Sequence, residues 1–387
     1  MFPIEIANPG RAFPKSDLTE RMATQNQQPS EMTSGVDSSA SVRAWPRLLI
    51  VGSFLPGFEL ARYAGGNLAV EIIRGGGKVI TTSNRRWQPL RLADMLRTIH
   101  RRRGEYDLAH VTVFSGRAFI YAECVVALLC VLGKRCTLGL HGGNLPVFAG
   151  HHPTRTRRLL NRSSVAVCPS RYLFEELKSF GRELHLIPNA LHIAKYPCKA
   201  ARFPGRRLLW LRAFHSIYNP GMAIAMFSRV LDAIPDASMA MAGPDKGDGT
   251  FQAAKKMAKD LGLLERVSFP GPIPKEDVPK VMARHDVFVN TTNVDNTPVS
   301  VVEAMACGLP VVSTNVGGIP YLLEHGKTGL LVSPDDAGEM AGAVKSLLSE
   351  PQLAQDLADN GRNLAKSFDW NVVLPQWQRL LTRVAFG

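Results

Sequence analysis

The sequence predicts an α/β protein made of two Rossmann-like, doubly wound units. The first observation is length, because 387 residues exceed what one hydrophobic core usually organises, so two cores are expected. The second is alternation, since short apolar runs are followed by Gly-containing loops and by longer segments of helical period. The third is that the short runs are apolar on both faces, which is typical of parallel strands covered by helices on each side.

The composition is that of a globular protein rich in turns. Hydrophobic residues make up 45% of the chain and charged residues 20%, which excludes collagen, a coiled coil and wholesale disorder. The 6 cysteines form no Cys-x-x-Cys pair, do not cluster with histidine at zinc spacing and follow no secretory signal. We therefore expect reduced thiols in a cytoplasmic protein. The longest apolar run, 118–132, is shorter than the ~20 residues of a membrane helix, and we expect a buried helix there.

Residues 1–44 are rich in Gln, Ser, Thr, Asn and Pro without an apolar period, which predicts a disordered tail. The first Rossmann-like unit is expected at 45–198, because a Pro-rich and basic segment follows without apolar period. We expect hinge motion near 190–205. The strand candidates of this unit are 47–51, 78–82, 108–113, 136–140, 164–168 and 184–188.

The second unit, expected at 199–370, restarts the same alternation of short apolar runs and helical segments. The last residues, 371–387, carry aromatic and Leu residues suited to packing, and we expect a helix that returns to the first unit. The strand candidates of the second unit are 207–211, 237–243, 266–271, 286–290, 310–314 and 329–332.

The most informative segment follows the strand candidate 286–290, because ligands of doubly wound sheets bind beyond the carboxyl ends of the strands. Thr297 is a suitable N-cap, Pro298 suits the first helical position, and Gly308 with Pro310 stops the helix. The N-terminus of this short helix offers backbone N–H groups and a partial positive charge to a diphosphate or to sugar hydroxyls.

Polar side chains near this helix complete the predicted site. Asn296, Thr297 and Ser300 add hydrogen-bonding groups at the helix start. Glu303, on the second turn, can accept hydrogen bonds from two vicinal ribose hydroxyls when its carboxylate is ionised. The alternative for Glu303 is a solvated helix carboxylate, and spacing alone does not decide between the two.

The segment resembles the signature of family-four retaining glycosyltransferases of GT-B fold, the glycosyl transferases group 1. In that signature, two acidic residues separated by seven others precede the run Ala-Met-Ala-x-Gly-x-Pro-Val-Val. Here Asp295 and Glu303 are the acids, and AMACGLPVV follows. Asp295 stands where the family more often has Glu. The resemblance covers about residues 47–385 and implies two Rossmann-like domains facing a central cleft, with the acceptor on the first domain and a nucleotide-sugar donor on the second.

The resemblance also implies which residues bind the donor. Arg212, at the end of the strand that opens the second domain, takes the place of an Arg that contacts the diphosphate. Without the resemblance, a surface arginine would be the better interpretation. The family's accompanying Lys position falls on Tyr218 or Asn219, and Lys246 is the candidate substitute, because a departing diphosphate needs positive charge. The predicted donor-binding residues are Arg212, Lys246, Asn296, Thr297, Pro298, Val299, Ser300 and Glu303.

His141 follows the strand candidate 136–140 and precedes two glycines that let a ligand approach the backbone closely. In similar enzymes a His at this position faces the donor phosphate or the reacting sugar, and a structural histidine is the alternative. The predicted catalytic residues are His141, Asp295 and Glu303, and the predicted acceptor-side residues are Gly142 and Gly143.

No Asp-x-Asp triplet occurs in the chain, so we expect donor binding without a metal or any other cofactor. The resemblance implies a retaining transfer, with Asp295 orienting the sugar, from a UDP- or GDP-linked donor to a glycan or lipid-linked acceptor in cell-envelope polysaccharide or glycolipid synthesis. The net charge of +13 favours anionic partners. The basic segments 101–103 and 151–162 suit an anionic membrane surface, which predicts a peripheral position at the inner face of the plasma membrane. A merely solvated basic helix is an equal alternative.

Other functional classes explain less of the sequence. A dinucleotide-dependent oxidoreductase also has two Rossmann-like domains, but no Gly-x-Gly-x-x-Gly follows a strand, and Gly65 and Gly66 are expected on the first helix, away from such a loop. A non-enzymatic membrane or nucleic-acid binder explains the charge but not Asp295 and Glu303, expected as a solvent-facing pair. Because no aromatic platform accompanies the basic clusters, we expect no nucleic acid partner. A pseudo-enzyme that keeps the fold without transfer stays open because of the missing Lys.

Overall fold

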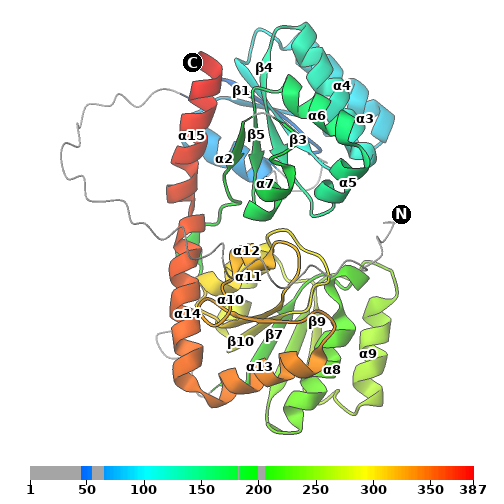
Figure 1. Ribbon diagram of the computed structural model, residues 1–387, viewed down its shortest axis with the longest axis vertical. Helices are drawn as coiled ribbons and strands as arrows, with labels where there is room; N and C mark the ends of the chain where they lie inside the picture. The colour runs from blue at the N-terminus through cyan, green and yellow to red at the C-terminus, as the bar shows by residue number, and fades with distance from the viewer. Residues whose placement is uncertain (1–44, 55–64, 182, 199–204) are drawn as a thin grey trace, which may run out of the picture. The chain divides into compact units, whose positions relative to one another are not determined.

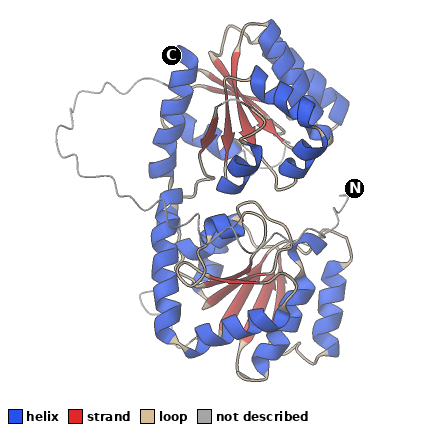
Figure 2. Cartoon of the chain, viewed as in Figure 1, coloured by secondary structure: helices blue, strands red, loops and turns tan. Residues whose placement is uncertain are grey.

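The computed structural model describes residues 45–54, 65–181, 183–198 and 205–387. Residues 44–387 form one compact body. It contains two six-stranded sheets with helices packed against them, and each sheet with its helices is one of the two predicted units (Figure 1, Figure 2). Neighbouring strands within both sheets pair in parallel. The predicted α/β fold with two doubly wound sheets is confirmed.

The first sheet has the strand order β2-β1-β3-β4-β5-β6, and each predicted strand segment of the first unit overlaps one of these strands. Two hydrophobic clusters lie on its two faces, one with α3 and α4 and the other with α2. The strands are β1 (Leu48–Val51), β2 (Val79–Thr82), β3 (Leu108–Val113), β4 (Arg135–Leu140), β5 (Val165–Cys168) and β6 (Leu184–Leu186), and the helices are α2 (Gly66–Arg74), α3 (Gln88–Arg101), α4 (Arg117–Val131), α5 (Leu145–His151), α6 (Pro153–Arg162) and α7 (Arg171–Leu177).

The second sheet has the order β12-β11-β10-β7-β8-β9, and its strands also fall on the predicted segments. One cluster packs α8, α9 and α13 on one face, and another packs α10 and α11 on the opposite face. The strands are β7 (Arg207–Leu211), β8 (Ser238–Ala242), β9 (Val267–Gly271), β10 (Val287–Asn290), β11 (Val311–Thr314) and β12 (Leu330–Val332), and the helices are α8 (Pro220–Leu231), α9 (Thr250–Asp260), α10 (Val278–Ala283), α11 (Val299–Ala306), α12 (Ile319–Leu322), α13 (Ala337–Ser349) and α14 (Pro351–Ala365).

The last helix, α15 (Trp370–Phe386), follows the second sheet in sequence but packs in the core of the first (Figure 1). The backbone N–H of Leu191 donates to the carbonyl of Phe368, and the N–H of Trp370 donates to the carbonyl of Leu191, so the chain segment between the sheets is bonded to the start of α15. The residues of α15 buried in the first core are Trp370, Val373, Trp377, Leu380, Leu381 and Val384.

One expected burial is wrong. The apolar run 118–132 forms α4, but only one face of this helix is buried, and Ile120 is 45% and Val131 83% exposed. Glu123 on this helix pairs with Arg155 of α6 at 2.5 Å, because a charged residue at a solvent-accessible edge finds a partner there. Among the described residues, no helix is long and apolar enough to cross a membrane. The predicted tail, residues 1–44, lies outside the described residues, and so does the second side of the predicted boundary, which begins at residue 199.

Candidate functional site

The candidate site begins where the order of the second sheet reverses. β7 and β10 are neighbours, and the strands that follow each of them lie toward opposite edges. In doubly wound sheets, ligands bind beyond the carboxyl ends of the strands at such a reversal. Arg212 follows β7 directly, and the segment 291–298 follows β10, so strand pairing brings these two stretches together.

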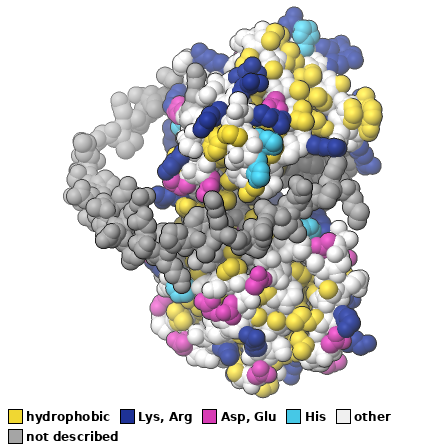
Figure 3. Space-filling view, turned by 45° about the vertical axis from the view of Figure 1, so that its right-hand side comes forward, with side chains coloured by type: hydrophobic (Ala, Val, Ile, Leu, Met, Phe, Trp, Pro, Cys, Tyr) yellow, Lys and Arg dark blue, Asp and Glu magenta, His cyan; other side chains and the backbone are white. Residues whose placement is uncertain are grey.

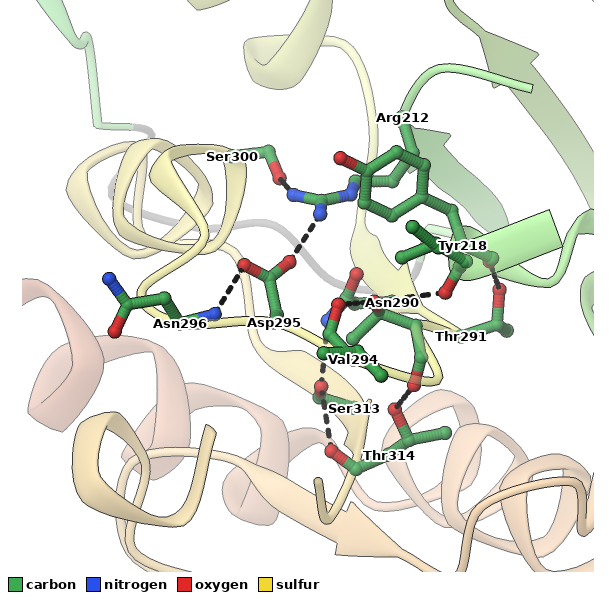
Figure 4. Close-up of polar contacts among 12 residues, drawn as sticks. Arg212, Tyr218, Asn290, Thr291, Val294, Asp295, Asn296, Ser300, Ser313 and Thr314 are labelled. Atoms are coloured by element: carbon green, nitrogen blue, oxygen red, sulfur yellow. Dashed lines mark hydrogen bonds and ion pairs between the residues drawn. The ribbon is translucent and has the colours of Figure 1, made fainter. Parts of the chain in front are cut away.

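Arg212 is held on three sides (Figure 4). Its guanidinium donates to the Asp295 carboxylate and, at 3.2 Å, to Ser300 Oγ, while its Cζ lies 4.0 Å from the centre of the Tyr218 ring. The Arg212 side chain is 10% exposed, and its buried Nε has no hydrogen-bond partner among the described residues. A desolvated guanidinium with a spare donor is a suitable partner for a phosphate oxygen.

The loop after β10 is fixed by its neighbours. Thr314 Oγ1 donates to the Thr292 carbonyl at 2.5 Å, and the Gly318 N–H donates to the Asp295 carbonyl at 2.9 Å. A Cβ at Gly318 would lie 1.6 Å from the carbonyl oxygen of Asn296. Only glycine allows this approach, so the Gly-Gly step before α12 sets the position of Asp295.

The helix α11 starts later than predicted. Its N-cap is Pro298, with φ −68° and ψ 116° and no side-chain cap bond, so the assignment of Thr297 as N-cap and Pro298 as first helical residue is wrong. The extended backbone of Pro298 lies outside the helical region, and the first turn begins at Val299. The helix ends as predicted, because Gly308 follows it with φ 69°.

The other predicted residues at this helix start face different surroundings. The Ser170 hydroxyl, which caps α7, donates to Asn296 Oδ1, so this amide contacts the first unit. Thr297 is half-buried, Pro298 is buried, and Val299 is 40% exposed. Only Ser300 among them reaches Arg212. The helix start thus joins contacts from both units instead of pointing every side chain at one ligand.

Glu303 is a buried carboxylate. The residue is 6% exposed, and its Oε1 accepts a hydrogen bond from the Tyr196 hydroxyl at 2.7 Å. Burial raises the pKa of Glu303 above its ordinary value, while the Tyr196 hydrogen bond and the charge of Lys275 lower it. The solvated alternative for Glu303 is therefore wrong, and so is the expected solvent-facing pair, because Asp295 is covered by Arg212.

Two uncharged histidines lie in the first unit. His141 follows β4 and stacks on Phe114, with ring centres 5.4 Å apart. His110 in β3 is 2% exposed, and its Nδ1 lies 2.9 Å from Thr137 Oγ1. Burial lowers the pKa of His141 to about 4 and that of His110 to about 3, the latter helped by His141. Near pH 7 both rings are neutral and can exchange hydrogen bonds with a hydroxyl group.

A cavity of about 920 Å³ has walls from both units. His110 and His141 line it from the first unit, and Lys275 and Val299 line it from the second. Gly65, which the sequence placed on the first helix, is the N-cap of α2, with φ 78°, and also lines the cavity.

The remaining predicted residues lie around the site. Lys246 is exposed in the loop after β8 and is not among the residues lining the cavity. Gly142 has φ 92°, and a Cβ at Gly143 would lie 3.7 Å from the backbone nitrogen of Asn296, so this glycine sits beside the loop after β10. No group of three metal-ligating side chains occurs in the described part of the chain.

Sequence reasoning missed four residues of this region: His110, Tyr196, Lys275 and Gly318. A histidine inside an apolar strand and a tyrosine in a linker look structural, and Lys275 belongs to a solvated loop by pattern. The adjacent glycines at 317–318 were a usable signal, because paired glycines often mark a close backbone approach. The region as a whole offers a desolvated cation at the start of α11, a buried carboxylate within that helix, and two neutral histidine rings that line the cavity.

Comparison with known proteins gives three findings. The family model "Glycosyl transferases group 1" matches residues 206–364. The chain is 32% identical over 312 residues, covering 73% of this chain and 76% of the relative, to a GDP-mannose-dependent alpha-(1-6)-phosphatidylinositol monomannoside mannosyltransferase of Mycolicibacterium smegmatis. Similar solved structures are Anabaena HepE with UDP and glucose (TM-score 0.69, 20% identity, 87% of this chain and 100% of that chain) and sucrose-phosphate synthase of Thermosynechococcus elongatus (TM-score 0.73, 18%, 87% and 99%).

These findings agree with the geometry. The family match spans Arg212, the loop after β10 and α11, which are the parts that form the candidate donor site. The solved structures share the two-sheet architecture, which is the GT-B fold. The chain is therefore an enzyme of the glycosyltransferase class with the GT-B fold, and it belongs to the family of glycosyl transferases group 1.

Proposed function

We propose that the chain transfers a hexosyl group, with retention, from a UDP- or GDP-linked sugar to a hydroxyl of a glycan or lipid-linked acceptor. The observation that carries this proposal is the buried Arg212 with its spare Nε–H, placed beside the start of α11. In the proposal, Arg212 and the free N–H groups of α11 bind the diphosphate. The Glu303 carboxylate accepts hydrogen bonds from the ribose hydroxyls.

The proposed reaction exchanges one bond at the anomeric carbon for another. The acceptor oxygen attacks this carbon while its bond to the diphosphate oxygen breaks, and the diphosphate leaves with the electron pair. The attack comes from the face on which the diphosphate leaves, which gives retention, and the acceptor proton passes to the leaving phosphate oxygen. Arg212 stabilises the charge that develops on the leaving group. Asp295 and the neutral His141 orient the sugar by hydrogen bonds, and the scheme needs no metal.

The second cation of the diphosphate site is open to two candidates. The position at which the family has a lysine falls on Tyr218 or Asn219, and the Tyr218 ring lies under the Arg212 guanidinium. Lys275 lines the cavity and acts electrostatically on Glu303, whereas Lys246 is exposed after β8. We propose Lys275 as the substitute for the family's lysine, because it lines the cavity together with Val299 of α11, and keep Lys246 as the alternative.

The relatives suggest which donor and acceptor to test first. The Mycolicibacterium relative uses GDP-mannose and a phosphatidylinositol mannoside, and Anabaena HepE was solved with UDP and glucose. A lipid-linked acceptor also suits the basic side chains of the first unit (Figure 3). Arg157, Arg158 and Arg162 are exposed on α6, where an anionic membrane surface would attract each of them by about 1 kcal/mol.

The test is thermal unfolding with excess UDP, GDP, ADP or NAD, in EDTA, for the wild type, Arg212→Ala and Glu303→Ala. At ~100 times the Kd, a ligand of the folded state adds about 2.7 kcal/mol of stability. One nucleoside diphosphate should raise the melting temperature of the wild type, and both variants should respond less. A response to NAD alone, or to none of the four, contradicts the proposal.

A second candidate is a pseudo-enzyme that binds the nucleotide without transfer. The observation that favours it is the pairing of Arg212 with Asp295, which neutralises the one cation placed at the end of β7. Sugar release from UDP-glucose or GDP-mannose in the presence of a lipid extract separates the two. Nucleotide binding without any turnover across donors and acceptors would favour the pseudo-enzyme.

A further inference from the structure

Tyr196 lies outside the segment 206–364 matched by the family model, yet it contacts the carboxylate proposed to bind ribose. Its hydroxyl donates to Glu303 Oε1 at 2.7 Å, and both residues are 6% exposed. We propose that Tyr196 is a positioning residue for donor binding, which holds Oε1 of Glu303 and directs the remaining lone pairs of the carboxylate toward the ribose hydroxyls. This inference rests on the proposed function of Glu303.

Tyr196 is placed by the chain segment between the two sheets. It ends the short 3-10 helix η2 (Ile193–Lys195), and its N–H donates to the Ile193 carbonyl at 2.9 Å. The N–H of Ile193 in turn donates to Asp369 Oδ2 at 2.9 Å, next to the start of α15. The ring of Tyr196 packs in the same cluster as Val302 and Met305 of α11. Two segments far apart in sequence thus press the tyrosine against the helix that carries Glu303.

The hydrogen bond matters because a buried carboxylate resists ionisation. The groups that face Glu303 are Tyr196 from the linker and Lys275 from the loop after β9, and both lower the pKa that burial has raised. The charge of Cys307, the C-cap of α11, contributes to raising the pKa of Tyr196. Burial and the Glu303 charge raise the pKa of Tyr196, so its hydroxyl stays protonated and keeps donating. Tyr196 therefore extends the pH range in which Glu303 is an ionised acceptor.

A pH dependence follows from this geometry. Ribose hydroxyls donate to an ionised carboxylate better than to a protonated one, so nucleotide affinity should fall as the pH drops through the raised pKa of Glu303. Loss of the Tyr196 hydroxyl raises that pKa further, which moves the fall in affinity to higher pH. A side chain that only filled space would not move the position of this fall.

The experiment is calorimetric titration of the full-length protein with UDP and with GDP between pH 5.5 and 8.5. The variants are Tyr196→Phe, Tyr196→Met, Glu303→Gln and the control Tyr106→Phe. Tyr106 is also buried and its hydroxyl donates to the Ile99 carbonyl at 3.1 Å, but it lies in the first core. Both Tyr196 variants should bind up to about tenfold more weakly than the wild type, as expected for a lost hydrogen bond to a charged group, and the loss should shrink as the pH rises. Tyr106→Phe should match the wild type.

Three results would overturn the inference. If both Tyr196 variants follow the wild-type profile while Glu303→Gln binds weakly, Glu303 binds the nucleotide but Tyr196 does not position it. If Tyr196→Phe and Tyr106→Phe weaken binding equally at every pH, the loss reflects general destabilisation. If Glu303→Gln binds like the wild type, the proposed role of Glu303 fails and the role of Tyr196 fails with it. The melting temperature of each variant, measured in the same buffers, shows that it is folded.

Discussion

The candidate site residues of the two units differ in their charge. Arg212, at the end of β7, forms a nearly buried ion pair with Asp295 in the loop after β10. Glu303 in α11 adds a buried carboxylate. In the first unit, His110 and His141 are uncharged near neutral pH, because burial lowers their pKa values to about 3 and about 4. The charged candidate groups thus lie in the second unit, and the two neutral histidines lie in the first.

This difference matches the division of labour that the proposed function requires. The nucleoside diphosphate of the proposed donor is charged, and the family model matches residues 206–364, inside the second unit. An acceptor hydroxyl is neutral and differs from one enzyme to another. The charged side can therefore be read from a signature, whereas the neutral side offers only hydrogen bonds and shape to its ligand.

The largest expected effect is at Arg212. Arg212→Ala should lower kcat/KM by about 10²–10³-fold, because it removes the charge that stabilises the leaving diphosphate and leaves the Asp295 carboxylate without its partner. Steady-state kinetics with the donor identified by thermal shift measure this. Arg206→Ala is the matched control, because Arg206 pairs with Asp236 on the surface and such pairs contribute little. Equal losses in both variants would remove the contrast between a site arginine and a surface arginine.

A substitution in the first unit should change the turnover number and leave nucleotide binding unchanged. His141→Ala should lower kcat by about 10²-fold, as misplacement of a reacting group can, while the Kd for the nucleoside diphosphate stays unchanged. Turnover and nucleotide titration on the same preparation separate the two quantities. A weaker nucleotide Kd in this variant would place His141 in the nucleotide site and blur the comparison.

The buried His110 should make the first unit sensitive to acid. Its folded pKa of about 3 lies below its unfolded value of 6.5, so the stability that comes from keeping it neutral is present above pH 6.5 and is lost as the pH falls toward 3. The melting temperature of His110→Gln should fall less than that of the wild type between pH 7 and pH 4. Parallel curves for the two proteins would show that another group titrates in this range.

The smallest effect is expected at Tyr218, whose ring lies under the Arg212 guanidinium. Tyr218→Ala should weaken nucleotide binding by about twofold to fivefold, the equivalent of about 0.5–1 kcal/mol for a cation–π contact. Tyr172→Ala is a control, because the Tyr172 ring packs against Tyr321 instead of Arg212. A loss as large as that of Arg212→Ala would mean that the ring binds the ligand itself.

The sequence by itself determined the two-sheet fold and the strands that compose it. Strands such as β1 and β5 are buried at every position, so a continuous apolar run of four or five residues, bounded by polar or Gly-containing loops, was sufficient to locate each one. The donor segment could also be identified from the sequence, because Asp295, Glu303 and the run that follows lie in one continuous stretch. The order of these residues along the chain is the family signature.

Tertiary structure decided what surrounds these residues. The pairing of Arg212 with Asp295 joins residues 83 positions apart, and the bond from Tyr196 to Glu303 joins residues 107 positions apart. Burial of Glu303, the late start of α11 at Val299 and the return of α15 to the first core depend on the same long-range packing. Spacing along a chain specifies which face of a strand or helix a side chain occupies, but the partner on that face is fixed only when the sheets and the crossing segments pack together.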